Sequence, residues 1–508
     1  MIGVCRSFYW LAVLGVAAFC CGDSAPGNSR AGKYFSGKNA KFIRPNVVHL
    51  DYQGVETSVP QSISVDGTLD LAVVVSGGQN MSYSYGESAI KQRLDRVAAL
   101  APPWVFARPS LQPMNYSLLV QGGEDGYAAV VSGSYNIFDP DAPLSGYLDG
   151  LLSGYLLFDA NRWNPLLLKT ILENNNFTYS KEYDGSDLEM PADLTVVLDP
   201  KTHLPYLIRG FEKHPLLGTS THDLRVYDYI LVEGVMIPQH FKTIYNSHQL
   251  IVDWVVDEVQ ERYTNYNYLG PYVGTVDELK AEQSWSDLPG VWVMEQPGYL
   301  YRQMLLELQE FVVVLDAPSQ QSNDIIKWVD DNIRKPIRMV IPTNHHHDHA
   351  MGLPDYVKVG AKVVVPDMAK EYYHGIPNME AGTFTRENPF ILEHDDFRAA
   401  IIHMHDNHHA KDHVYAVVMP SCVSTNSIVV VFEADFVISN KALDTNNDHT
   451  ELWQLIQNMQ SHRVSKHAEI VSVHGFLPSL QLSPLLEITG LAYPDFTPSD
   501  FKYGVSRC

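Results

Sequence analysis

The most informative stretch of this chain is Thr343-Asn344-His345-His346-His347-Asp348-His349. It indicates both the fold of the second half and the kind of site found there. It follows the apolar run Met339–Ile341 and precedes a predicted helix, so it occupies a strand-to-helix turn. Histidine gathers around it, because 15 of the 21 histidines lie between positions 345 and 474. Imidazole and carboxylate are standard ligands of zinc and similar ions. The stretch therefore predicts a metal site, the alternative being a surface histidine tract without one.

Other apolar runs bring further candidate ligands at their ends. They are Val312–Leu315 followed by Asp316, Val414–Met419 preceded by His408 and His409, Ile428–Phe432 followed by Asp435, and Ile470–Val473 followed by His474. Ligands placed at the ends of neighbouring strands meet at one edge of a sheet and form a preorganised site. From about residue 288 strands also alternate with helical stretches, which indicates an α/β fold.

In this order and spacing, the five elements resemble the metallo-β-lactamase-fold hydrolases over residues 288–491. The likeness is strongest to the branch that reads Val-Asp-Ala-Pro and then Thr-His-His-His-x-Asp-His-x-x-Gly. The resemblance implies an αββα sandwich of two mixed sheets over residues 286–495. It also implies one or two divalent ions, most often zinc, that activate a water for hydrolysis.

The family pattern His-x-His-x-Asp-His can be laid on this sequence residue by residue. The resemblance then implies a first site of Asn344, His346 and either His409 or His408, with His409 preferred, and a second site of Asp348, His349 and His474 bridged by Asp435. Asp348 would orient the reacting water. Asp316 would support the motif loop, and His347 would shape the cavity mouth.

The chain departs from the family at Asn344, where the pattern has its first histidine. An amide oxygen is a weaker zinc ligand than imidazole, so the first site is weakened and a single zinc ion becomes an alternative to two. His345 is a second alternative, since it could rotate into the vacant ligand position. The other histidines of this half, including His403 and His413, receive no role.

The first half of the chain has a different sequence pattern. Residues 38–276 contain short apolar and aromatic runs separated by turn signals, which predicts a β-rich antiparallel domain. Helical pattern is confined to residues 88–100 and 144–172. The segment 193–259 resembles the curved half-barrel sheets of lipoprotein-carrier-like domains, and such a half-barrel could hold an apolar ligand.

The N-terminal residues 1–24 read as a secretory signal peptide. Arg6 precedes the apolar run Phe8–Cys21, whose 14 residues are short for a membrane-spanning helix, although a retained anchor is the alternative. A secreted or extracytoplasmic chain would keep two cysteines, Cys422 and Cys508, which could form a disulfide. It also offers N-glycan acceptor triplets at Asn80, Asn115 and Asn176.

Composition narrows the class of function. The net charge of −23 disfavours nucleic acid and anionic lipid as partners. The resemblance to the hydrolase family implies a small-molecule substrate. The sequence contains neither Gly-x-Ser-x-Gly nor His-Glu-x-x-His, so the common serine hydrolase and zincin patterns are absent. We expect a secreted metal-dependent hydrolase of an ester, amide, lactone or related bond. The alternative is a binding protein that kept the fold and lost turnover, with a ligand held by its N-terminal domain. The sequence makes no prediction of oligomeric state.

Overall fold

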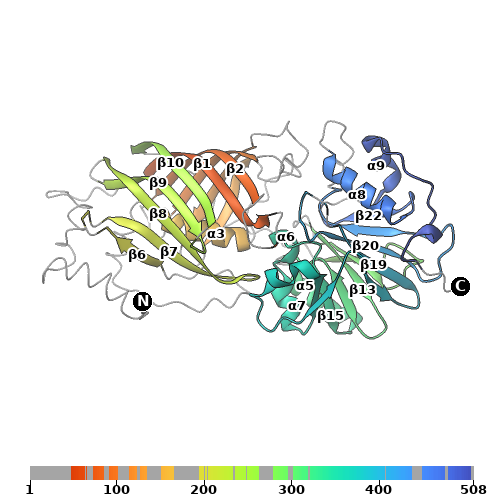
Figure 1. The fold of residues 1–508 in the computed structure, drawn as a ribbon. Coiled ribbons are helices and arrows are strands. Elements are labelled where there is room, and N and C mark those ends of the chain that lie inside the picture. Colours follow the sequence, from red (N-terminus) through yellow and green to blue (C-terminus); the bar gives the residue numbers. More distant parts are fainter. Residues whose placement is uncertain are drawn as a thin grey trace.

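The structure, a computed structural model, describes most of the chain outside its N-terminal segment and several connections. The described residues are 47–62, 65, 72–84, 91–100, 114–122, 126–133, 150–164, 194–199, 201–202, 204–232, 235–247, 249–261, 279–295, 301–318, 321–404, 406, 408–437, 449–474 and 479–504. The predicted signal peptide at residues 1–24, Asn176 and Cys508 lie outside them. Figure 1 shows two bodies, one built from the first half of the chain and one from the second.

The first body is a single ten-stranded antiparallel sheet. Its strands are β1 (Val47–Ser62), β2 (Ala72–Ser84), β3 (Lys91–Leu100), β4 (Met114–Gln121), β5 (Tyr127–Gly133), β6 (Leu194–Leu198), β7 (Pro205–His214), β8 (Gly218–Val232), β9 (Val235–Tyr245) and β10 (Gln249–Glu261). They run in the order β5-β4-β3-β2-β1-β10-β9-β8-β7-β6. Two meanders are thus joined where β1 pairs with β10. This confirms the β-rich antiparallel region predicted from the turn spacing.

One face of this sheet packs against helix α3 (Gly150–Arg162). Buried strand residues such as Leu118, Ile208 and Phe241 form one core with Trp163, which directly follows the helix. The approach is close at Gly210 of β7, where an added Cβ would lie 2.0 Å from the ring of Phe158. A strand buries alternate residues, so one face of each strand supplies this core.

The helical pattern expected at residues 88–100 is wrong, because residues 91–100 form strand β3. Apolar residues recur there at helical spacing, with Leu94, Val97 and Leu100 three apart. In the sheet, however, Leu94 is buried opposite Met81 of β2 and Leu118 of β4. Pairing on both sides gives the backbone its hydrogen bonds and overrides the local propensity.

The second body contains two mixed sheets. The first has seven strands in the order β11 (Lys280–Glu282), β12 (Val291–Glu295), β13 (Arg302–Glu307), β14 (Val312–Leu315), β15 (Ile337–Ile341), β16 (Lys362–Pro366) and β17 (Ala381–Phe384). The second has six, in the order β18 (Phe390–Glu393), β19 (Phe397–His403), β20 (Val414–Pro420), β21 (Val430–Glu433), β22 (Glu469–Ser472) and β23 (Leu480–Gln481). The pairs from β14 to β17 and the pair β21–β22 are parallel, and the rest are antiparallel.

Helices cover the outer faces of both sheets. They are α5 (Ser322–Trp328), the π-helical turn η3 (Val329–Ile333), α6 (His347–Ala350), α7 (Leu353–Lys358), the 3-10 helix η4 (Asp367–Tyr373), α8 (Thr450–Ser461), α9 (Leu482–Thr489) and the 3-10 turn η6 (Pro498–Asp500). None of the described helices has the length and apolar character needed to cross a bilayer.

Side chains alternate between the two faces of each strand, and this alternation produces the layers of the second body. In β14, Val312 and Val314 pack with the helices on one side, whereas Val313 and Leu315 pack against the other sheet. The six-stranded sheet divides in the same way, since Val418 faces the first sheet and Val417 faces α8. The helix–sheet–sheet–helix order confirms the αββα sandwich expected for this half of the chain.

Candidate metal centre

Asp316, at the end of β14, fixes the histidine-rich turn. Its Oδ1 accepts hydrogen bonds from the backbone N–H of Thr343 at 3.2 Å and from its hydroxyl at 2.6 Å. Its Oδ2 lies 3.0 Å from Nδ1 of His349. The carboxylate therefore engages Nδ1 and leaves Nε2 of His349 facing the site. An imidazole held in this way is the usual arrangement of a metal-binding histidine.

The conformation of Asp316 is itself specialised. Its φ of 72° lies in the left-handed region, which residues other than glycine rarely adopt. Its side chain is fully buried, and burial raises the pKa of its carboxyl group, although the charge of His349 opposes that rise. Backbone strain and a buried carboxylate together mark a position that serves a site.

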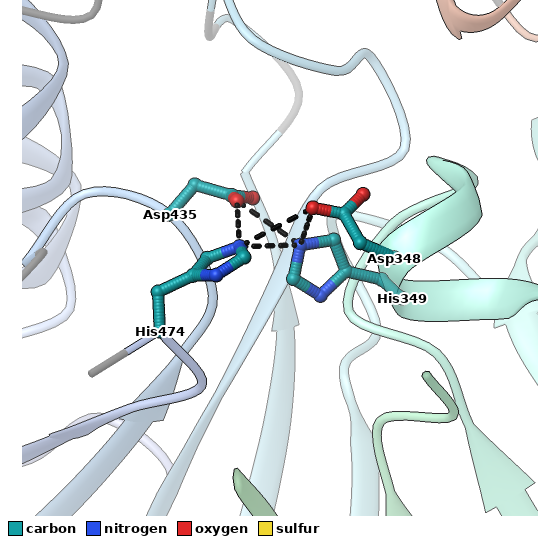
Figure 2. A group of neighbouring side chains, drawn as sticks. All are labelled: Asp348, His349, Asp435 and His474. Carbon is teal, nitrogen blue, oxygen red and sulfur yellow. Dashed lines mark hydrogen bonds and ion pairs between the residues drawn. The ribbon is translucent and has the colours of Figure 1, made fainter. Parts of the chain in front are cut away.

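Four side chains converge beside this turn: Asp348, His349, Asp435 and His474 (Figure 2). Their ligand atoms all lie within 4.8 Å of one another. Nε2 of His349 is 3.0 Å from Oδ1 of Asp435 and 3.2 Å from Nε2 of His474. Oδ2 of Asp348 is 3.6 Å from the first imidazole and 3.4 Å from the second.

These separations match the coordination shell of a small divalent ion. Bonds of about 2.0–2.1 Å in a tetrahedron place neighbouring ligand atoms roughly 3.3 Å apart, close to the observed 3.0–3.6 Å. The donor set of two imidazoles and two carboxylates is the chemistry that zinc accepts. The residues present therefore fit the divalent ion implied by the sequence resemblance.

The electrostatics of the group favour a cation. Burial lowers the pKa of His349, but the charges of Asp435, Asp316 and Asp348 outweigh it and place that pKa well above the usual value. Burial raises the pKa of Asp435, but His349 and His409 outweigh it and hold that pKa well below the usual value. Ionised carboxylates gathered at one buried point need positive charge or hydrogen bonds to stabilise them.

Strand ends deliver these ligands from distant parts of the sequence. Asp348 and His349 lie on α6, directly after the turn that follows β15, and His474 comes two residues after β22. The loop with Asp435 is folded back by Glu433, whose buried carboxylate accepts the backbone N–H groups of Phe436 and Val437 at 2.9 and 3.1 Å. Sequence reasoning gave Glu433 no role, although a buried charged residue within an apolar run was a usable signal.

The amide oxygen of Asn344 does not point toward Asp435, where a first-site ligand was expected. Its amide NH2 donates to Oδ2 of Asp435 at 2.8 Å, and its Oδ1 accepts the backbone N–H of His346 at 2.9 Å. His346 is buried, and its ring stands edge-on to that of His409 at 4.6 Å between centroids. Within the described residues, neither histidine joins a second group of converging ligands.

The structure separates the alternatives that the sequence left open. Nε2 of His409 lies 3.2 Å from Oδ2 of Asp435, whereas His408 is exposed and its backbone N–H donates to Gln454. His345 is buried beside the site, but its Nδ1 lies 2.7 Å from Asp412 rather than at the group. The structure therefore places His409 at the group, His408 in solvent and His345 against Asp412.

Two further residues border the site without having been predicted. His413 is fully buried, with Nδ1 3.8 Å from Oδ2 of Asp435, and burial lowers its pKa to about 3. Its position directly before β20 was the available signal. Glu451 on α8 lies 3.5 Å from Nδ1 of His409, and no local pattern pointed to it.

Comparisons with known proteins give structural likenesses only. No family model and no curated protein matches the chain. Among solved structures, a metallo-β-lactamase from Hirschia baltica is similar at 16% identity and a TM-score of 0.32, covering 43% of this chain and 99% of that one. One from Pontibacter korlensis is similar at 18% identity and a TM-score of 0.31, covering 42% and 97%. The functional argument therefore rests on the side chains described above.

The anchoring role of Asp316 predicts a specific defect for Asp316→Asn. The amide keeps the size of the side chain but loses the charge that holds the imidazole of His349. We expect zinc affinity, measured by competition with a chromophoric chelator, to fall about 10- to 100-fold, as for other residues that orient metal ligands. Asp396→Asn, at an exposed carboxylate, is the control and should leave affinity unchanged. Equal affinity in both variants would contradict the role assigned to Asp316.

Proposed function

We propose that this protein is a metal-dependent hydrolase whose ion is held by Asp348, His349, Asp435 and His474. The observation that carries the proposal is the convergence of these four ligand atoms within 4.8 Å of one another. They come from three separate segments of the chain, so no single surface tract of histidines accounts for them. A zinc ion bound there would supply Lewis acidity and would lower the pKa of a water enough to make it a nucleophile.

Asp348 is the group best placed to handle that water. Its side chain is 13% exposed, whereas those of His349, His474 and Asp435 are 0%, 1% and 4% exposed. Solvent and substrate therefore reach the group from the side of Asp348. Burial raises its pKa, but the charges of His349 and His347 outweigh it, so the pKa lies well below the usual value. The ionised carboxylate can accept a hydrogen bond from water and orient it toward an ester, amide or lactone carbonyl.

Asn344 favours one tightly held ion over two. The amide directs an NH2 donor at Oδ2 of Asp435, the oxygen that would bridge to a second ion. That donor occupies the space of a ligand and offers no lone pair. His346 and His409 remain as imidazoles on this side, but they lack the third neutral donor of a full first site.

The number of ions held tests this proposal. The wild-type chain should retain about one equivalent of zinc after dialysis, following the single complete donor set. Asn344→His should add about one more, because imidazole replaces the donating amide. His349→Ala should remove the first equivalent together with hydrolysis of a panel of chromogenic esters, amides and lactones. Elemental analysis of the purified chains gives these numbers.

Two outcomes would contradict this reading. Two tight equivalents in the wild-type chain would mean that another residue, with His413 the nearest, completes the first site. No retained metal under metal-replete conditions would instead favour a binding protein that kept the fold without turnover. His240→Ala, at a histidine half-exposed on the N-terminal sheet, is the control and should not alter the count.

We also propose that the chain is secreted or otherwise enters an extracytoplasmic compartment. Three features support this: the signal-like segment at residues 1–24, a disulfide at Cys422, and exposed glycan acceptors at Asn80 and Asn115. The partner of Cys422 lies outside the described residues, and the sequence expectation pairs it with Cys508. Disulfides persist in oxidising compartments, which agrees with this route.

Expression of the full chain in a eukaryotic host tests the compartment. Mass spectrometry of the medium should find a mature chain that begins between residues 20 and 28, carries glycans, and contains a Cys422–Cys508 peptide pair. Asn80→Gln should reduce its mass by one glycan. A chain that keeps Met1 and accumulates in the cytosol with free thiols would contradict the proposal.

A further inference from the structure

The carboxylate of Asp435 faces two different sets of side chains. Its Oδ1 lies 3.0 Å from Nε2 of His349, within the four-ligand group (Figure 2). Its Oδ2 is approached instead by Asn344, His409 and His413. All three of these residues are buried. The second oxygen therefore has buried polar neighbours of its own.

His409 is oriented as a metal ligand. Its Nε2 lies 3.2 Å from Oδ2 of Asp435, and its Nδ1 lies 3.5 Å from the carboxylate of Glu451 on α8. A carboxylate behind one ring nitrogen, with the other nitrogen facing the site, is the usual arrangement of a metal-binding histidine. Asp316 holds His349 in the same way on the other side of Asp435. Both oxygens of Asp435 thus face an imidazole that is backed by a carboxylate.

His413 directs a lone pair toward the same oxygen. Its Nδ1 lies 3.8 Å from Oδ2 of Asp435 and 3.4 Å from the amide nitrogen of Asn344. The amide oxygen of Asn344 accepts the backbone N–H of His346, and this bond leaves the NH2 group facing His413. Because an NH2 group can only donate, Nδ1 of His413 is the acceptor and the ring proton lies on Nε2. Two acceptor atoms that face each other need a donor or a cation beside them.

The NH2 group of Asn344 is that donor. It lies 2.8 Å from Oδ2 of Asp435 and 3.4 Å from Nδ1 of His413, and it has one hydrogen for each of these atoms. Its partial positive charge takes the part that a cation would play between a carboxylate and an imidazole. An ion can enter only when the amide turns away. This explains why the described residues contain no second group of ligands as tight as the first.

The remaining separations are close to those that a small ion requires. Oδ2 of Asp435 is 3.2 Å from Nε2 of His409, near the roughly 3.3 Å between neighbouring ligand atoms of a tetrahedral ion. Its 3.8 Å to Nδ1 of His413 is about 0.5 Å longer than this spacing, so the imidazole has to move slightly when the amide leaves. Ligands that must first rearrange bind an ion more weakly than the preorganised four-ligand group.

We propose that Oδ2 of Asp435, Nε2 of His409 and Nδ1 of His413 form a second, weaker site for a divalent cation such as zinc. The amide of Asn344 blocks these three atoms, named the Oδ2 site, until it is displaced. His346 stands beside them, with its ring 4.6 Å from that of His409. The inference rests on the proposed metal-dependent function and adds to it a ligand, His413, that the family pattern does not contain. The chain then holds one ion tightly and a second only at higher zinc activity.

Removal of the amide donor tests the block. In Asn344→Ser the hydroxyl can still accept the backbone N–H of His346, but no NH2 group remains. The second equivalent of zinc should bind about 10- to 100-fold more tightly than in the wild-type chain, the change expected for the loss of one hydrogen bond to a charged group. Asn344→Ala should show a gain in the same direction. Equilibrium dialysis of the full chain against buffered zinc measures both equivalents.

A further substitution tests the ligand. Asn344→Ser/His413→Gln loses the nitrogen that faces Asp435, while the glutamine amide keeps a polar group near the position of Nε2. The gain in affinity for the second equivalent should disappear. Asn344→Ser/His462→Gln is the matched control and should keep the gain, because His462 is also buried but contacts Tyr503 at the end of α8. The first equivalent should bind equally tightly in all of these chains.

Diffraction separates a ligand from a residue that only supports the loop. Crystals of Asn344→Ser at saturating zinc should show a second anomalous peak about 2.1 Å from Nδ1 of His413. A loop that was merely loosened by His413→Gln would not place an ion there.

Three results would overturn the Oδ2 site. They are a second equivalent that binds no more tightly in Asn344→Ser and Asn344→Ala than in the wild-type chain, a gain that survives in Asn344→Ser/His413→Gln, and a second anomalous peak without contact to His413. Each of them leaves the first ion, and so the proposed hydrolase, intact. Absence of the first equivalent instead contradicts the proposed function, and the Oδ2 site falls with it because it shares Asp435.

Discussion

The Asp316 carboxylate is the interaction on which the candidate metal centre depends. It holds Thr343 with one oxygen and His349 with the other, so it sets both the path of the histidine-rich turn and the direction of one ligand. The backbone N–H of Asp316 in turn donates to Ile341 at the end of β15. A ligand held by a buried, fully engaged carboxylate loses little freedom when an ion binds, and preorganisation of this kind favours both affinity and catalysis.

The layered architecture then brings the remaining ligands to the same point. Parallel strands end at one edge of a sheet, which explains how Asp435 after β21 and His474 after β22 meet Asp348 from the other sheet. Asn344 alters this arrangement of ligands only on the side of Asp435 that faces His409. By donating to Asp435 it helps fix the shared carboxylate in place, while removing a ligand from the neighbouring position. In the proposed function, one complete and one incomplete set of ligands follow from this single side chain.

The α/β character of the C-terminal half was predictable because its strands are apolar runs with one candidate ligand at or near an end, and the resemblance to metallo-β-lactamase-fold hydrolases implied the αββα sandwich. The same signal indicated Asp316, Asp348, His349, Asp435 and His474. The sequence preferred His409 but kept its neighbour His408 as an alternative, since the two differ only in which way the loop directs them. Contacts between residues distant in the chain could not be predicted from local sequence either. Strand β3 has a helical pattern of apolar residues. Nothing in the sequence places Leu216, in the turn between β7 and β8, in the core of the second body. Such features depend on partners distant in the chain.

X-ray diffraction from crystals of the zinc-loaded full chain, recorded on both sides of the zinc absorption edge, tests the central claim most directly. The account predicts one strong anomalous peak among Asp348, His349, Asp435 and His474, with at most a weak one between His346 and His409. Two peaks of equal height would contradict the proposal that Asn344 weakens the first metal site. A peak away from these four side chains would contradict the proposed metal centre itself.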